Sequence, residues 1–140
     1  MKIVLAVDGS AYTKRMLGYI AAHDELLKGD NEFVAVNATM VLPASVTGFL
    51  SSEMVHSYYT EEGDKVLKPV VEFARMQGWK LRETHVVGQP VEVLAAAVEA
   101  EKADLLVMGS HGHGIVKGAV LGSVSTRLIA HTRVPVLIVR

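Results

Sequence analysis

The residues best suited to hold a ligand lie in two short segments, one near the start of the chain and one in its last third. Asp8-Gly9-Ser10 directly follows an apolar run. The second segment is rich in glycine and contains Gly109, Gly112, Gly114, Gly118 and Gly122. Glycine lets the backbone approach a ligand closely and adopt positive φ.

A helix is expected to start near Ser123, directly after the glycine-rich segment. The start of a helix offers unbonded N–H groups, and Ser123 and Ser125 add hydroxyls. Further donors nearby are His111, His113, Lys117 and Arg127. These features predict an anion site made chiefly of backbone.

Neither of the two common nucleotide-binding motifs is present. A P-loop needs Gly-Lys-Ser/Thr entering a helix, but here Lys117 precedes Gly118 and no hydroxyl follows. A dinucleotide-binding fold needs three glycines after its first strand, where only Gly9 stands. Any nucleotide must therefore be held in another way.

Four apolar runs, one segment that alternates before it turns apolar, and the amphipathic stretches between them must position these residues. We interpret the four runs as strands over residues 3–7, 33–36 with an extension toward Leu42, 105–108 and 136–139, and the alternating segment 80–87 as a further strand. Helices are expected after Ser10, over about 64–77, from Pro90, and over 123–131. Runs that are apolar throughout are typical of strands buried on both faces of a parallel sheet. The pattern predicts one α/β domain over residues 1–140, with an open five-stranded parallel sheet and helices on both faces.

Some of these elements are less clearly marked. Residues 44–63 show no persistent periodicity, so we expect a loop that leads into the helix at about 64. Pro69 predicts a kink in that helix or a later start. Ser10 and Ser123 are good N-cap residues for the helices that follow them. The mixed pattern of residues 80–87 places the third strand near an edge of the sheet.

In open parallel sheets, ligands bind beyond the carboxyl ends of the strands, where the winding direction reverses. The first strand ends at Asp8 and the fourth at Gly109. If these two strands are neighbours, Asp8 and the glycine-rich loop face one crevice.

Composition argues against several classes of protein. Lys and Arg number 14 against 15 Asp and Glu, a net charge of −1, so there is no electrostatic footprint for nucleic acid or an anionic membrane. The chain has no cysteine, which removes disulfides and thiol chemistry and favours the cytosol. No apolar run approaches the roughly 20 residues that a membrane-spanning helix needs. We expect a cytoplasmic protein that binds neither nucleic acid nor membrane.

The spacing Gly109-x2-Gly112-x9-Gly122-Ser123, with Asp8 closing the first strand, resembles the universal stress protein family. The resemblance spans the whole chain and includes the closing segment 134–139. The resemblance is to the ATP-binding branch of the family, in which this glycine pattern wraps around the ribose and phosphates. It implies the strand order 3-2-1-4-5 of an adenine nucleotide alpha hydrolase-like fold, with ATP as ligand and Mg²⁺ beside the phosphates.

The same resemblance implies site residues. Those on the adenine and ribose side would be Ala6, Val7, Asp8 and, as the adenine wall, Ala38. Those on the ribose and phosphates would be Met108, Gly109, Gly112, Gly122, Ser123 and Val124.

Simpler interpretations remain open for these residues. Asp8 suits a turn before a helix, and glycines can shape a loop without any ligand. His111 and His113 lack a third ligand at a recognisable spacing, which favours solvated loop histidines over a metal site.

Three functions therefore stay open. The first is an ATP-binding module that senses or stores nucleotide in a stress response. The second is a slow ATPase or a self-phosphorylating protein with Ser123 or Ser125 as acceptor; of the carboxylate pair that phosphoryl transfer needs, only Asp8 is available. The third is a nucleotide-free dimeric interaction protein. The short apolar strand Val136 to Val139 is an edge that a two-fold partner would pair with, so a homodimer is expected.

Overall fold

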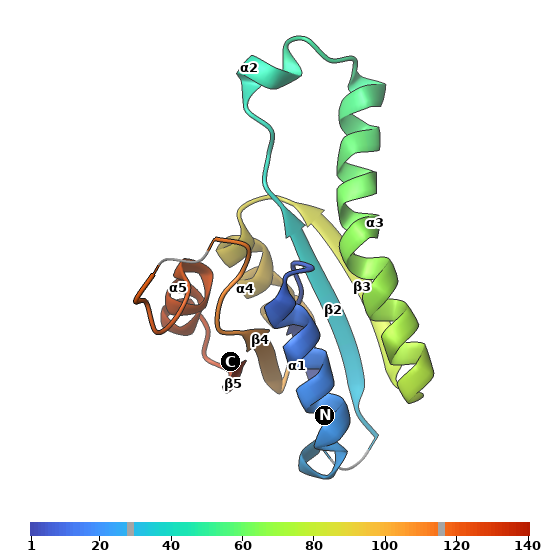
Figure 1. Cartoon of the computed structure of the whole chain (residues 1–140), viewed down its shortest axis with the longest axis vertical. Coiled ribbons are helices and arrows are strands. Elements are labelled where there is room, and N and C mark those ends of the chain that lie inside the picture. The colour runs from blue at the N-terminus through green and yellow to red at the C-terminus, as the bar shows by residue number, and fades with distance from the viewer. Residues whose placement is uncertain (28–29, 115–116) are drawn as a thin grey trace.

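The computed structural model has five parallel strands in one sheet, with helices on both faces (Figure 1). It describes residues 1–27, 30–114 and 117–140. The strands are β1 (Lys2–Ala6), β2 (Glu32–Thr39), β3 (Lys80–Val87), β4 (Leu105–Gly109) and β5 (Val136–Val139). Their order is β3-β2-β1-β4-β5, so the expected order 3-2-1-4-5 is confirmed, and β3 lies at an edge as predicted.

The helices alternate with the strands along the chain. They are α1 (Ala11–Ala22), α2 (Ala44–Thr47), α3 (Ser52–Gln77), α4 (Pro90–Ala100) and α5 (Ser123–His131), with a 3₁₀ turn at Asp24–Leu27. In Figure 1, α1 and α3 lie in front of the sheet. No helix in the described ranges is long and apolar enough to cross a lipid bilayer.

The central strands are buried on both faces, which explains why they are apolar throughout. Ile3 and Leu5 of β1 pack in a cluster with side chains of α1 and α3. Val4, between them, packs in a second cluster with α4 and α5. Because successive strand residues point to opposite faces, a strand covered on both sides has no polar position to alternate with.

The expected start of a helix at about residue 64 is wrong. α3 begins at Ser52 instead of about residue 64, Pro69 lies inside it, and α2 forms within the segment expected to be a loop. The side chain of Ser51 caps α3 by accepting a hydrogen bond from the N–H of Met54 at 3.2 Å. The first buried residue of α3 is Gly63. Since no residue of the preceding turns is buried, they lack the apolar periodicity by which a helix is identified in a sequence.

Candidate functional site

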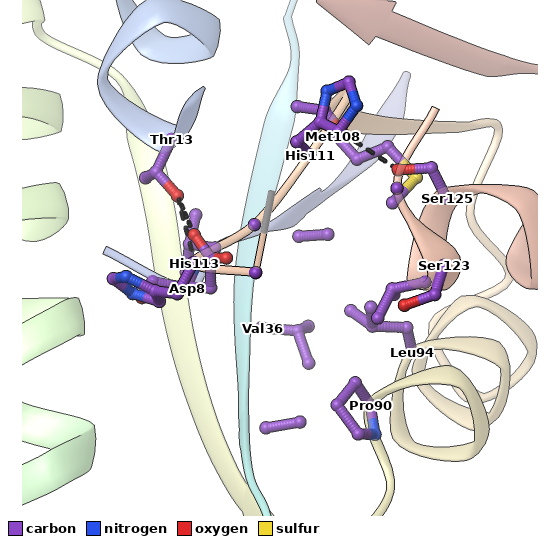
Figure 2. Close-up of a pocket in the computed structure, with 18 of the residues that line it drawn as sticks. Asp8, Thr13, Val36, Pro90, Leu94, Met108, His111, His113, Ser123 and Ser125 are labelled. Carbon is purple, nitrogen blue, oxygen red and sulfur yellow. Dashed lines mark hydrogen bonds between the residues drawn. The ribbon is translucent and has the colours of Figure 1, made fainter. Parts of the chain in front are cut away.

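A cavity of about 330 Å³ opens at the carboxyl ends of β1, β2 and β4 (Figure 2). β1 and β4 are hydrogen-bonded neighbours, and Ala6 lies opposite Met108. The chain order reverses between these strands, which is where such sheets bind ligands. The residues expected from the sequence all line this cavity: Ala6, Val7, Asp8, Ala38, Met108, Gly109, Gly112, Gly122, Ser123 and Val124.

Asp8 is fixed by its own turn. Its Oδ1 atom accepts hydrogen bonds from the N–H of Ser10 at 2.9 Å and from the hydroxyl of Thr13 at 2.9 Å. Figure 2 shows Asp8 and Thr13 bonded on one side of the cavity. The other oxygen, Oδ2, makes no hydrogen bond to a described residue. One oxygen of Asp8 therefore has the turn role that its position favours, and the other is available to a ligand.

Asp8 also replaces the capping bond expected from Ser10. Ser10 stands at the N-cap of α1, but its side chain makes no capping bond, and its buried Oγ has no partner in the described part of the chain. The carboxylate of Asp8 accepts the Ser10 N–H instead. The end of β1 and the start of α1 are thus joined through one side chain.

Three glycines of the loop leave no room for a side chain because other protein atoms lie close to them. A Cβ on Gly112 would lie 2.6 Å from Asp8 Oδ2, and one on Gly109 would lie 2.6 Å from the Cβ of Tyr12. A Cβ on Gly122 would lie 3.2 Å from backbone atoms of Ser110 and His111. Of the five glycines of the segment, Gly118 has positive φ, at 86°, whereas Gly109, Gly112 and Gly122 do not. They allow the loop to pack closely on Asp8 and α1.

The start of α5 forms the opposite side of the cavity. Its N-cap is Gly122, and Ser123 is the first helical residue, so Ser123 is not the cap that the sequence predicts. Gly122 donates its N–H to Ser110 at 2.7 Å. The N–H groups of Ser123, Val124 and Ser125 have no acceptor within the residues that the structure describes. These are first-turn N–H groups, which a helix leaves unbonded and which attract anions.

Ser123 and Ser125 differ in accessibility. Ser125 is buried, and its hydroxyl donates toward the carbonyls of Ser110 at 3.0 Å and Gly109 at 3.2 Å. It therefore ties α5 to the end of β4. Ser123 is exposed beside the free N–H groups, so of the two hydroxyls only Ser123 is accessible to a phosphoryl donor.

The two loop histidines hold the loop in place. His113 Nε2 donates to the carbonyl of Asp8 at 2.7 Å, and His111 Nε2 donates to the carbonyl of Ala119 at 3.0 Å. The His111 ring also lies against Tyr12, with centroids 5.2 Å apart. No group of three metal-ligating side chains occurs among the residues described. Lys117 and Arg127, expected as further donors, do not line the cavity.

Several residues of the site carry no clear sequence signal. Asn37 donates from Nδ2 to the carbonyl of Val7 at 2.9 Å and so fixes the end of β1. The one sign of this role in the sequence is that a polar amide side chain stands within an otherwise apolar strand. Pro90 and Leu94 of α4 form a wall of the cavity (Figure 2). These two residues line the cavity because of the way α4 crosses the sheet, and that crossing cannot be predicted from the sequence of α4.

Known proteins are similar to this chain over its whole length. A family model described as "Universal stress protein family" matches residues 1–140. Universal stress protein MJ0531 of Methanocaldococcus jannaschii is 31% identical over 140 residues, which cover 99% of this chain and 81% of the relative.

Solved structures share the fold. That of protein MJ0577, also from Methanocaldococcus jannaschii, has a TM-score of 0.81 at 26% identity and covers 99% of this chain and 94% of its own. A universal stress protein solved in complex with cAMP has a TM-score of 0.72 at 25% identity and covers 100% of this chain and 97% of its own.

Proposed function

Because this chain belongs to the universal stress protein family, we propose that it binds an adenine nucleotide in the cavity between β1, β4 and α5, with ATP as the ligand. The relative solved with cAMP supports this class of ligand. The observation that carries the proposal is the pairing, across one cavity, of the free oxygen of Asp8 with the free N–H groups of α5.

The two sides of the cavity favour one orientation of the nucleotide. A carboxylate accepts hydrogen bonds from ribose hydroxyls but repels phosphate, so the ribose belongs at Asp8 Oδ2. The start of α5 has unbonded N–H groups and the positive end of the helix dipole, so the phosphates belong near Ser123 and Val124. The base would then lie against the apolar wall that includes Ala38 and Leu94.

Asp8 is the one carboxylate among the described residues that line the cavity. We therefore propose that Mg²⁺ enters with the phosphates and keeps mainly water and phosphate oxygens as ligands, as this ion prefers. Phosphoryl transfer also needs a residue that positions the attacking group. A module that senses or stores nucleotide fits this lining better than an efficient ATPase does. Self-phosphorylation is the second candidate, with the accessible Ser123 as acceptor.

We also propose that β5 forms the edge of a homodimer. β5 is the last strand of the sheet, and Val136, Leu137 and Ile138 are only partly buried. A two-fold related copy would pair with this edge and cover these side chains.

Isothermal titration calorimetry with ATP and Mg²⁺ tests the nucleotide site. Asp8→Asn keeps the oxygen that caps α1 but replaces the free oxygen by an amide that cannot accept a ribose hydroxyl. We expect about tenfold weaker binding, which corresponds to about 1.4 kcal/mol. The matched control is Asp104→Asn, since Asp104 accepts the N–H of Lys2 at the other end of β1. Absence of binding heat from the unsubstituted protein at about 100 μM would reject the proposal.

A further inference from the structure

Residues 41–62, which we call the arm, project away from the sheet beyond the end of β2 (Figure 1). The arm contains α2, which has no buried residue, and the part of α3 that precedes its first buried residue, Gly63. At its base, the hydroxyl of Tyr59 accepts the N–H of Leu42 at 2.9 Å. The arm is thus an ordered structure whose side chains are left largely uncovered.

The uncovered side chains of the arm include large apolar ones. Phe49 is 91% exposed, Val41 64% and Met54 56%. Val46 and Tyr58 are exposed as well. Apolar side chains gathered on one projecting element are typical of a protein–protein contact. An aromatic residue as exposed as Phe49 is the kind of side chain that anchors such a contact.

The arm is also acidic. Residues 41–62 contain Glu53, Glu61 and Glu62 and no lysine or arginine. Glu62 pairs with Lys65 of the following turn, whereas Glu53 and Glu61 form no ion pair with any residue that the structure describes. Two arms placed against each other would bring these like charges together, which disfavours an arm-to-arm contact.

The last part of the chain has the opposite charge. No acidic residue follows Asp104, and the basic residues there are Lys117, Arg127, Arg133 and Arg140. All four are exposed, and none forms an ion pair within the described ranges. Val120 and Ile129 are exposed on the same part of the chain, at 65% and 44%. We call the exposed part of residues 117–133, around α5 and outside the β5 edge, the C-terminal face.

We propose that the arm of one copy of this chain docks on the C-terminal face of a second copy. The acidic and apolar arm is complementary to the basic and apolar face, and the arm points away from the α5 of its own chain (Figure 1). A two-fold arrangement in which each arm lies on the other copy's face closes after two copies, so the contact does not grow into a fibre.

This contact is separate from the proposed β5 pairing. Two β5 edges paired by a two-fold axis run antiparallel, so the carboxyl ends of the two halves of the sheet point in opposite directions. In the sheet, β1 and β4 lie between β2 and β5. The arm of a copy paired through β5 therefore also lies several strand widths from the C-terminal face of the first copy. The arm must therefore reach a different copy, and the two contacts together predict a tetramer.

Mass measurement in solution, by light scattering after gel filtration, tests the arm contact through charge reversal. Glu53→Lys with Glu61→Lys makes the arm basic, and Arg127→Glu with Arg133→Glu makes the face acidic. Each double variant should have half the mass of the unsubstituted protein. An equimolar mixture of the two should regain the full mass, because each arm then meets a face of opposite charge. Raising the salt concentration should weaken the association.

The control is Glu92→Lys with Glu99→Lys, which makes the same two Glu-to-Lys changes as the arm variant at two exposed positions of α4 and should leave the mass unchanged. Equal masses for the unsubstituted protein and both reversed variants would overturn the proposal, whether the protein is then monomeric or the arm serves another partner. Failure of the mixture to regain mass would also overturn it. If only the β5 pairing fails, every measured mass is lower, but the unsubstituted protein still has twice the mass of each charge-reversed variant.

Discussion

The free carboxylate oxygen of Asp8 occupies the space in which a side chain at residue 112 would begin, since a Cβ on Gly112 would lie 2.6 Å from Asp8 Oδ2. Asp8 closes β1 and caps α1 through its other oxygen. The loop after β4 therefore packs directly on the residue that joins β1 to α1. Ligand binding, loop position and the start of α1 are coupled through this one carboxylate.

Gly112→Ala should displace the Asp8 carboxylate. The added methyl group overlaps Oδ2, and moving the carboxylate weakens its bonds to Ser10 and Thr13, so we expect a loss of about 1–3 kcal/mol in the free energy of unfolding. ATP affinity should fall with it. Urea unfolding and calorimetry measure the two effects. Gly114→Ala is the control for stability, since a Cβ there meets nothing within 4 Å. A Gly112→Ala protein as stable as the control would contradict the coupling.

Gly63→Ala should destabilise the protein although it removes a glycine from a helix. In an exposed helix this change stabilises by about 1 kcal/mol, but here the new Cβ would lie 2.7 to 2.9 Å from ring atoms of His85. The His85 ring is held by a 2.8 Å hydrogen bond to Thr39 and cannot move away freely.

The sign of that effect should invert when the ring is removed. In a His85→Ala background, Gly63→Ala should raise the unfolding free energy. The control is Gly18→Ala in α1, where a Cβ meets nothing within 4 Å. This substitution should raise the unfolding free energy with or without the His85 ring. Urea unfolding of the four variants in the Gly63–His85 cycle measures the inversion. An unchanged sign would show that α3 does not rest on His85 as described.

Leu106→Ala should leave a cavity in the centre of the sheet. Leu106 is 0% exposed on β4 and packs in the cluster shared with α4 and α5. Loss of this side chain should cost about 2–5 kcal/mol of unfolding free energy. Val120→Ala, at a position 65% exposed, should change it by less than about 0.5 kcal/mol. Similar effects of the two substitutions would contradict the burial of β4.

Stability should depend on pH through Glu101. The guanidinium of Arg82 donates two hydrogen bonds to this carboxylate, at 2.9 and 2.7 Å, and lowers the pKa of Glu101 from its usual value. Partial burial opposes the lowering, and the charge of Lys2 adds to it. The folded protein therefore binds this proton less readily than the unfolded chain does. The stabilisation is present above the unfolded pKa and is lost as the pH falls through the folded one.

Glu101→Gln should therefore lower the unfolding free energy most near neutral pH. The difference from the unsubstituted protein should shrink below about pH 4.3, the ordinary value for glutamate, and vanish further into the acid range. Thermal or urea unfolding between neutral and acid pH measures it. Glu99→Gln removes an exposed carboxylate near the end of α4, which Glu101 follows, and serves as the control for the change in charge. A difference that stays constant with pH would contradict the assignment.

By itself, the sequence determined the sheet and the place of the site. The apolar runs of β1, β2, β4 and β5, and the periodicity of α4, are local patterns because burial on both faces or on one face selects residue types directly. The positions of Asp8 and Gly109 at strand ends, together with the family resemblance, were enough to predict ten of the residues that line the cavity, but not its wall on α4. Local periodicity could not show that α3 starts at Ser52, because no residue of α3 before Gly63 is buried.

Only the tertiary structure decided why particular residues are needed at the site. Gly109 is fixed by Tyr12, Gly112 by Asp8 and Gly63 by His85, and each pair is distant in sequence. The same holds for Asn37, which fixes Val7 across two strands. Such contacts depend on how close two packed elements come, to within a fraction of an ångström. Hydrophobic pattern specifies which face of an element is buried, but the distance between buried faces is set only when all of the side chains between them have packed.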